Sequence, residues 1–468
     1  MGFETSTEGA EIRYTLDAST PTMDYSTKYS SPLTLKRTTV VRACAFKKDY
    51  LPSTPITNTY LIGVPHTLPV LSIVTEPEYL WDRRNGIYTN SNRSGKAWEC
   101  PASATLFQPD GTPQVTFAAG LRIHGGASRQ RSDKQSFRLY FRKKYGESVL
   151  DAPIFPSAPA ISHIDRLVLR GGYNDSWCHG TAAKWNIATY VRDQLVRDLH
   201  LDMGAVAAHG DFVALYLNGE YWGLYNICER ISGEFLSQYL GEGDWDIIKD
   251  DQAREGDSIA WEQFKAWYES VDLSLAENYR IIGGMMDIEN FTDYFILNTW
   301  VHNYDWPHHN WYTARRRGDT NARWMFLIWD AEYAFGGGRE PFQSDRNTLV
   351  RASTPHGPLG LLFNKMLQNT EYRAYFTARF EEHLKGVLSP DHVLKRLAER
   401  LDQVRPEIKA EARRWHSSKS MADWEEAVDS VKAFVDQRTK YVRRHLQSIP
   451  DWLRYQSYPK WYPRYPRK

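Results

Sequence analysis

Two polar side chains in the segment NYDWPHHN, residues 303–310, have the types and spacing that phosphoryl transfer requires. Asp305 is followed five residues later by Asn310. In a kinase-like site, a carboxylate orients the incoming hydroxyl and accepts its proton, while a nearby amide oxygen holds a divalent cation. Because magnesium prefers hard oxygen ligands, these two side chains suit it better than histidine nitrogens do. The spacing alone occurs by chance in many long chains, so a further carboxylate is needed.

Asp330 supplies a second carboxylate in the segment FLIWDAEYAFG. It follows a run of apolar strand residues, and a charge at the end of a buried strand is costly unless a metal or a cation compensates it. The order of loop, hairpin and carboxylate is the order of the catalytic and metal-binding elements in kinases. The alternative is that Asp330 only forms a turn at the end of the strand.

A histidine zinc site is a competing interpretation of the same loop, since His302, His308 and His309 are close in sequence. However, His308 and His309 are adjacent, and neighbouring side chains on regular structure cannot easily bind one metal ion. The segment also lacks the H-x-x-x-H spacing of helical zinc sites. The sequence therefore favours oxygen ligands over zinc-binding histidines.

The segment LRIHGGASRQRSDKQSFRLYFRKK is a candidate phosphate-binding surface. Gly125 and Gly126 follow a predicted strand, and glycines in a turn let backbone amides approach phosphate oxygens. Lys134 lies on the polar face of the next predicted strand, where a lysine can neutralise phosphates. Arg122 and Arg138 lie nearby in the sequence. The alternative is an ordinary solvated basic face.

Three further charged residues have two interpretations each. Glu229, in the segment NICERI, ends a predicted strand and is either a surface carboxylate or the partner of a cation. Arg192 and Asp193 lie in a predicted helix over 181–200, where they either form salt bridges along the helix or provide the acidic partner of Lys134.

Residues 70–250 are predicted to be rich in strands. Alternating polar and apolar residues in KQSFRLYFRKKYG predict a strand with one buried face. The dipeptide Asn218-Gly219, between two apolar runs, predicts a hairpin with a type I′ turn. Apolar residues at helical spacing predict the helix over 181–200.

From about residue 251 to 450, helices are predicted to dominate. The segment MDIENFTDYFILNTWVHN predicts a helix that leads directly into the loop of Asp305, and a strand, a turn and a strand follow. Ser389 and Pro390 have the residue types preferred at the N-cap and first position of a helix. We therefore predict an α+β fold with a strand-rich lobe and a helical lobe.

Residues 1–62 are predicted to form a small Ig-like all-β sandwich, because short alternating runs are separated by turn-rich segments. The string IRYTLDASTPT…TTVVRACAFKKDYLPS resembles the β-sandwich module at the C-terminal end of chitobiase-like β-hexosaminidases. This resemblance implies a spacer, or an accessory that contacts cell wall or polysaccharide. The module starts in what looks like mid-strand, so we expect it to be truncated. Residues 63–69 are predicted as a linker and 451–468 as a basic, aromatic tail.

Composition excludes several classes of protein. The 468 residues suffice for two or three domains, and 58 basic residues nearly balance 57 acidic residues. This balance argues against a generic nucleic-acid-binding protein. No apolar run approaches the ~18–20 residues of a membrane span, and the first residues lack the pattern of a signal peptide. None of the four cysteines forms a CxxC pair, which argues against a zinc ribbon and leaves disulfide pairing open.

Four segments together resemble the CotH-type (spore coat protein H) family of atypical protein kinases. They occur in the family's order and span roughly residues 70–450: RIHGGASR…DKQSFRLYF, LNGEYWGLYNICERI, NYDWPHHNWY and RWMFLIWDAEYAFG. The resemblance implies a two-lobed kinase-like fold that uses ATP with Mg²⁺ or Mn²⁺. By position, it implies that Asp305 is catalytic and that Asn310 and Asp330 bind the metal.

The same resemblance implies nucleotide-binding roles for the basic segment. Lys134 matches the family's nucleotide lysine, with Arg122 and Arg138 beside it, and Glu229 matches a characteristic glutamate. The sequence departs from the family in two places: the glycine turn reads HGGAS instead of Arg-Gly-Asn-Ser, and Glu332 stands where a second aspartate is common.

The sequence therefore predicts a secreted or surface-associated bacterial protein that transfers the γ-phosphoryl group of ATP to Ser or Thr hydroxyls of a protein substrate. One alternative is a catalytically inactive scaffold associated with cell wall or polysaccharide. A second is a carbohydrate-active enzyme, which the N-terminal module and the 17 tryptophans would suit. Such an enzyme needs two carboxylates about 5–10 Å apart across a sugar-binding cleft.

Overall fold

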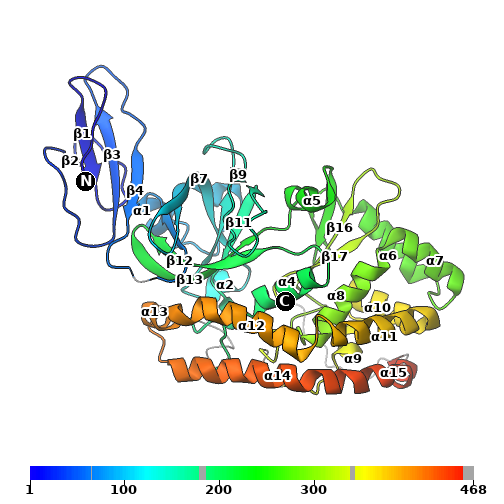
Figure 1. Cartoon of the computed structure of the whole chain (residues 1–468). Helices are drawn as coiled ribbons and strands as arrows, with labels where there is room; N and C mark the ends of the chain where they lie inside the picture. The colour runs from blue at the N-terminus through cyan, green and yellow to red at the C-terminus, as the bar shows by residue number, and fades with distance from the viewer. Residues whose placement is uncertain (65, 179–185, 338–342, 457–468) are drawn as a thin grey trace. The chain divides into compact units, whose positions relative to one another are not determined.

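The computed structural model describes residues 1–64, 66–178, 186–337 and 343–456. The chain divides into two compact units, and neither unit is a single continuous stretch (Figure 1). The first unit comprises Met1–Ala183, His209–Arg230 and Leu401–Trp424. The second comprises Lys184–Ala208, Ile231–Arg400 and Glu425–Lys468.

The N-terminal part of the first unit is all β, as predicted. Four strands form one antiparallel sheet in the order β2-β1-β3-β4, rather than two facing sheets. In β3, Val40, Val41 and Cys44 are all buried, so burial along this strand does not alternate strictly. The strands are β1 (Glu11–Thr15), β2 (Thr27–Lys28), β3 (Thr39–Phe46) and β4 (Ile56–Tyr60).

A closed seven-stranded barrel is the largest sheet of the first unit, in the order β11-β13-β12-β5-β6-β7-β8, and β9 and β10 form a separate two-stranded sheet. Register aligns Leu121, Leu139 and Leu167 across three neighbouring strands, and all three side chains are fully buried. The strands are β5 (Val70–Val74), β6 (Cys100–Phe107), β7 (Pro113–His124), β8 (Ser136–Tyr140), β11 (Arg166–Arg170), β12 (Gly210–Leu217) and β13 (Glu220–Glu229).

The predicted hairpin at Asn218-Gly219 is confirmed. It joins β12 to β13, and Leu217 pairs with Glu220 across the turn. Asn218 has φ = 50° and Gly219 has φ = 84°, as a type I′ turn requires at both central positions. The smaller elements of this unit are α1 (Pro77–Trp81), η1 (Lys96–Trp98), α2 (Ser128–Arg131), β9 (Leu150–Asp151), β10 (His163–Ile164), η2 (Tyr173–Asp175), η3 (Arg405–Glu407) and α13 (Ile408–Arg414).

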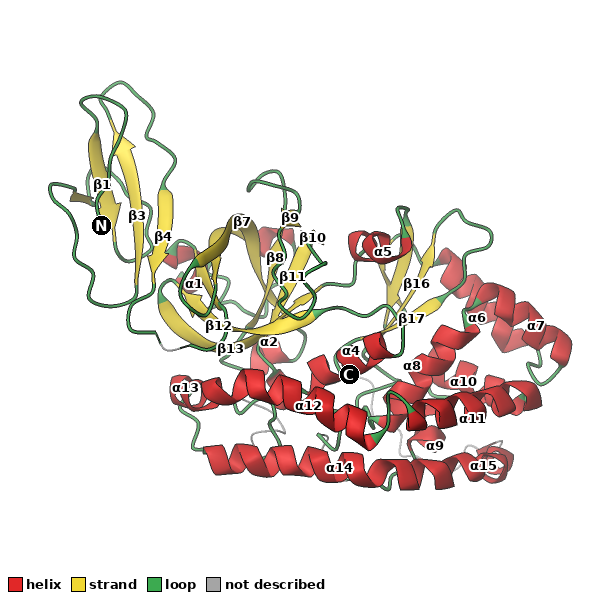
Figure 2. Cartoon of the chain, viewed as in Figure 1, coloured by secondary structure: helices red, strands yellow, loops and turns green. Residues whose placement is uncertain are grey.

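The second unit combines helices with a four-stranded antiparallel sheet in the order β15-β14-β16-β17, as Figure 2 shows in red and yellow. Its strands are β14 (Trp245–Lys249), β15 (Gln252–Glu255), β16 (Trp311–Arg316) and β17 (Met325–Ile328). Its helices are α4 (Arg192–Asp202), α5 (Gly233–Leu240), α6 (Ile259–Ser270), α7 (Ala276–Met285), α8 (Ile288–Trp300), α9 (Thr348–Ala352), α10 (Pro358–Gln368), α11 (Thr370–Lys385), α12 (Pro390–Val404), α14 (Met421–Gln447) and α15 (Ile449–Gln456). The helices α12 and α14 cross the boundary between the units.

Helix α8 is the central element of the second unit. The Asp287 side chain caps its first turn by accepting a hydrogen bond from Asn290 N at 3.1 Å. The helix packs against α4, α9, α11 and β17, and its aromatic side chains are buried. Phe295 stacks on Phe363 with ring centroids 4.1 Å apart. The loop of Asp305 therefore starts from a rigid support.

The predicted helix over 181–200 and the predicted tail differ from the observed elements. The helix predicted over 181–200 begins only at Arg192, because Asn186 and Tyr190 have positive φ values that helical backbone does not allow. Residues 181–185 of that prediction lie outside the described residues. The tail predicted over 451–468 starts within α15, which ends at Gln456, and its remaining residues also lie outside the described part.

The predicted α+β class with an all-β N-terminal module is confirmed. The domain limits at residues 62, 70, 250 and 450 stay predictions. Among the described residues, which include all four cysteines, there is no disulfide bond. No helix of the described part is long and apolar enough to span a membrane.

Candidate catalytic and metal-binding site

The loop that carries Asp305 is fixed to the end of α8. Asn303 donates from its backbone to Asn298 O at 3.0 Å and from its side chain to Asn298 Oδ1 at 2.9 Å. Trp306 is 2% exposed and donates from its indole nitrogen to Tyr294 Oη at 2.8 Å. Buried anchors on both sides of Asp305 hold its carboxylate in place while leaving it about one third exposed.

Asp305, Asn310 and Asp330 converge in the second unit. Asn310 Nδ2 lies 3.5 Å from Asp305 Oδ2 and 3.5 Å from the backbone oxygen of Asp330, which are long contacts. Asn310 has φ = 61° and Asp330 has φ = 60°. A left-handed backbone costs free energy at residues other than glycine, although Asn and Asp tolerate it best, and such strain clusters at functional sites.

The Asp305 carboxylate is held in its ionised form. Burial alone would raise its pKa, but the side chain of His308, with Nε2 at 3.4 Å from Asp305 Oδ1, lowers it below the usual value. Charge interactions with His309 and Arg351 act in the same direction. The group is therefore an acceptor at neutral pH, as a residue that orients a hydroxyl must be.

Two carboxylates, the buried Asp193 and the partly exposed Asp250, support both ends of the site. Asp193 Oδ1, in the first turn of α4, accepts a hydrogen bond from the backbone nitrogen of Ala331 at 2.8 Å, directly after Asp330. Asp193 also pairs with the fully buried Arg197 at 3.0 Å. Asp250 Oδ1 accepts from Trp311 N at 3.2 Å, directly after Asn310. The supporting role of Asp250 was not predicted from sequence.

Lys134 lies in the first unit and pairs with Glu411. Its ammonium group lies 2.6 Å from Glu411 Oε1 and 2.6 Å from Leu224 O, with both side chains of the ion pair buried. Glu411 Oε2 also accepts from Leu224 N at 2.8 Å. The acidic partner of Lys134 therefore includes a residue of α13 that the sequence did not single out, whereas Asp193 pairs with Arg197.

The other basic residues of the predicted phosphate surface face different partners. Arg122 contacts the carboxylate of Glu99, and Arg138 contacts Tyr140 Oη and His124 Nδ1. Arg122 and Arg138 line one pocket, which Lys134 does not line. Their nucleotide-binding roles stay predictions.

Glu229 is 3% exposed at the end of β13. It accepts hydrogen bonds from the backbone and ring of His209, at 2.9 and 3.2 Å. These contacts tie the ends of β12 and β13 together. Whether the carboxylate also serves a nucleotide stays a prediction.

The oxygen atoms of Asn310 and Asp330 suit a hard divalent cation. A carboxamide and a carboxylate are ligands that Mg²⁺ and Mn²⁺ accept. Among the described residues, no group of three or more His, Cys, Asp or Glu side chains is placed to hold a metal ion. Of the histidines in the loop, His302 is buried, whereas His308 and His309 are exposed.

Arg438 of α14 stabilises the junction between α8 and the loop. Its buried guanidinium donates to the backbone oxygens of Trp300 and Thr299 at 2.8 and 2.7 Å. It also donates to Ser344 O, Arg346 O and Thr348 Oγ1. The side chain therefore satisfies five acceptors at once, of which four are buried.

We expect Arg438→Met to lower the free energy of unfolding by at least about 3 kcal/mol, because the acceptors would stay buried without a donor. Arg443→Met, on the same helix, is the matched control. Arg443 is half exposed and pairs with Glu381, so its removal should cost at most about 1 kcal/mol. Urea unfolding followed by circular dichroism measures both. If both substitutions lower the free energy of unfolding equally, Arg438 does not stabilise the junction between α8 and the loop.

His302 predicts a pH dependence of stability. Burial lowers its pKa to about 3, and the nearby Arg438 and Arg351 act in the same direction. Between pH 6.5 and about 3, the unfolded chain binds a proton that the folded chain does not, so stability falls with falling pH. At 1.36 kcal/mol per unit, lowering the pH from 6.5 to 5 should cost about 2 kcal/mol through this group.

His302→Asn should remove that part of the pH dependence, and asparagine tolerates the φ of 52° at this position. His309→Asn, which changes an exposed neighbour, should leave it intact. Urea unfolding at pH 7 and pH 5 provides the comparison. If the free energy of unfolding falls by the same amount between pH 7 and pH 5 in both variants, His302 is not the buried neutral group that causes the pH dependence.

Comparison with known proteins identifies the relatives of this chain. A family model described as "CotH kinase protein" matches residues 121–442, which include Lys134, Glu411 and all three residues of the candidate site. A second model, described as "Fn3 associated", matches residues 3–60, the all-β module.

A relative named "Invasin CotH2", from Rhizopus delemar (strain RA 99-880), is 25% identical over 232 residues. The matched region covers 42% of this chain and 38% of that relative, so the chain spans well under half of the relative's length. That organism is a fungus, so the match gives no support to the predicted bacterial origin. Since one family model covers more than half of the sequence, the chain belongs to the CotH kinase protein family, with an N-terminal Fn3-associated domain.

Proposed function

We propose that this protein transfers the γ-phosphoryl group of ATP to serine or threonine hydroxyls of a protein substrate. The observation that carries the proposal is the convergence of Asp305, Asn310 and Asp330 at the end of α8 and β17, with two of them in a left-handed backbone conformation. Membership of the CotH kinase protein family supports it independently.

Each residue has a defined task in this proposal. Asp305 orients the acceptor hydroxyl and takes its proton, for which its lowered pKa keeps it ionised. Asn310 and Asp330 would hold Mg²⁺ or Mn²⁺, which supplies charge neutralisation for the phosphates. In protein kinases a lysine and glutamate ion pair accompanies these groups, and the Lys134 and Glu411 pair in the first unit is a candidate for it.

The alternative is a non-catalytic binding protein at a cell surface. The name "Invasin" of the fungal relative and the N-terminal Fn3-associated domain favour surface location for this chain too. We therefore propose that the protein is secreted or surface-associated under either function. The two functions differ in whether the chain binds a nucleotide together with a metal ion.

A thermal-shift measurement with ATP and Mn²⁺ separates these functions. A ligand at one hundred times its Kd stabilises the folded state by about 2.7 kcal/mol, so an active nucleotide site predicts a clear rise of Tm. The rise should need both ATP and Mn²⁺ and should disappear in Asp330→Ala. A Tm that ATP and Mn²⁺ leave unchanged in the wild type would favour the binding protein.

A further inference from the structure

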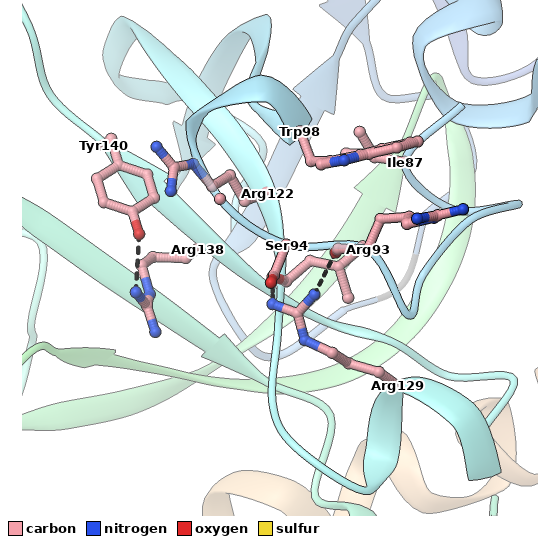
Figure 3. Close-up of a pocket in the computed structure, with 10 residues that line it drawn as sticks. Ile87, Arg93, Ser94, Trp98, Arg122, Arg129, Arg138 and Tyr140 are labelled. Carbon is pink, nitrogen blue, oxygen red and sulfur yellow. Dashed lines mark hydrogen bonds between the residues drawn. The ribbon is translucent and has the colours of Figure 1, made fainter. Parts of the chain in front are cut away.

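An arginine pocket of about 130 Å³ lies in the first unit (Figure 3). Four arginines from separate segments contribute to its lining: Arg93 from the loop before η1, Arg122 from β7, Arg129 from α2 and Arg138 from β8. Such a concentration of guanidinium groups around one small cavity repels itself unless an anion compensates it.

Arg129 builds the wall of this pocket and is not available to a ligand. Its guanidinium donates to the backbone oxygens of Gly125 at 2.7 Å and Arg93 at 2.6 Å. Further hydrogen bonds reach Ser91 O and Ile123 O. The loop that carries Arg93 is thereby tied to the end of β7, so the pocket is organised before any ligand arrives.

Arg122 and Arg138 present charge to the cavity. Both lie over the ring of Tyr140, with centroid distances of 4.4 and 5.6 Å, and Arg138 donates to Tyr140 Oη at 2.7 Å. Among the described residues, the buried Nε of Arg122 has no hydrogen-bond partner. Arg93 is exposed and is the third arginine that can contact an anion in the pocket.

The neighbouring carboxylate does not neutralise these arginines. Glu99 contacts Arg122, but it also accepts from Lys144 at 3.0 Å and lies 3.4 Å from Arg142. The single negative charge of Glu99 is therefore shared among Arg122, Arg142 and Lys144. The positive charges of Arg93 and Arg138 come in addition. The pocket keeps an excess of at least two positive charges, which matches a dianion better than a single carboxylate.

Size and lining define the ligand further. Pockets that hold drug-sized ligands measure about 300–1,000 Å³, so this cavity has room for one anionic group and not for a whole nucleotide. In Figure 3, Trp98 and Ile87 lie on the side away from Arg138 and Tyr140. These apolar surfaces would pack against the carbon atoms of the residue that carries the anion.

We propose that the arginine pocket binds a phosphoryl group carried by a serine or threonine side chain of a protein. Clusters of arginines recognise phosphorylated residues through bidentate, charge-assisted hydrogen bonds. This role goes beyond the proposed reaction, because it concerns a residue that is already phosphorylated. It also assigns Arg122 and Arg138 to a protein phosphate instead of the phosphates of ATP.

Fluorescence anisotropy with labelled peptides tests this site on the full chain without nucleotide, so the result does not depend on whether the chain transfers phosphate. A phosphoserine peptide should bind at least tenfold more tightly than the same peptide with serine. Arg93→Ala and Arg138→Lys should each weaken phosphopeptide binding at least tenfold, since lysine cannot form the bidentate contact. Arg131→Ala, an exposed arginine of α2 that does not line the pocket, should bind like the wild type.

Competition identifies the source of the phosphoryl group. Unlabelled phosphopeptide should displace the probe at much lower concentrations than inorganic phosphate or ATP. If inorganic phosphate competes equally well, the pocket binds free anions. If ATP competes equally well, the arginines of the pocket bind the nucleotide. Either result overturns the proposal. Equal binding of the two peptides, or unchanged binding in both pocket variants, would overturn it as well.

Discussion

Replacing Asp305 by asparagine should lower the rate of phosphoryl transfer by about 10²–10⁴-fold, the range that a positioned general base contributes. The substitution keeps the size and a hydrogen-bonding oxygen but cannot accept the hydroxyl proton. Stability should change little, because the side chain is about one third exposed and its contacts to His308, at 3.4 Å, and Asn310, at 3.5 Å, are long.

The rate is measured with labelled ATP, Mn²⁺ and a serine-rich acceptor peptide. Asp319→Asn is the matched control, because it makes the same change at an exposed carboxylate of the turn between β16 and β17. Binding of ATP should persist in Asp305→Asn, since the residue acts on the acceptor. If Asp305→Asn transfers phosphate at the wild-type rate, Asp305 has no catalytic role.

Replacing Glu411 by alanine should lower the free energy of unfolding by about 3–5 kcal/mol, the usual cost of leaving one member of a buried ion pair alone. The Lys134 ammonium is buried and would lose its partner at 2.6 Å. Leu224 N would lose its acceptor as well. Urea unfolding of the full chain measures the change.

The double variant Lys134→Met with Glu411→Leu separates folding from activity. A well-packed apolar pair of similar volume often matches a buried ion pair in stability, so the double variant should recover much of the loss. Phosphoryl transfer should nevertheless be lost in the double variant, because the lysine that would serve the phosphates is gone. A double variant that is stable and fully active would show that the pair serves structure alone.

Local sequence signals predicted several elements because the same signals stabilise them in the fold. The apolar pattern that ends in Trp300 gave α8, and the Asn218-Gly219 dipeptide gave the β12–β13 hairpin with both residues at positive φ. Asp305, Asn310 and Asp330 were predictable as a group because one hairpin connects them along the chain, which limits how far apart they can lie.

The missed features depend on contacts between distant parts of the chain. Lys134 and Glu411 are 277 residues apart. No local sequence pattern predicts that α13 supplies the buried carboxylate that pairs with Lys134. The helix over 181–200 was predicted from periodicity alone, which carries no information about the left-handed residues Asn186 and Tyr190. The alternation around Lys134 suggested one basic face, but Lys134 precedes β8 and its side chain is buried against Leu224 O.

Incubation of the full chain with γ-labelled ATP and Mn²⁺, wild type against Asp330→Ala, tests the central claim most directly. The variant removes one carboxylate from the candidate cation site while leaving the supporting contact of Asp193 to Ala331 N in place. The account predicts transfer of label to protein by the wild type and none by the variant, with both chains folded by circular dichroism. Equal labelling by the two chains, or none by either, would contradict it.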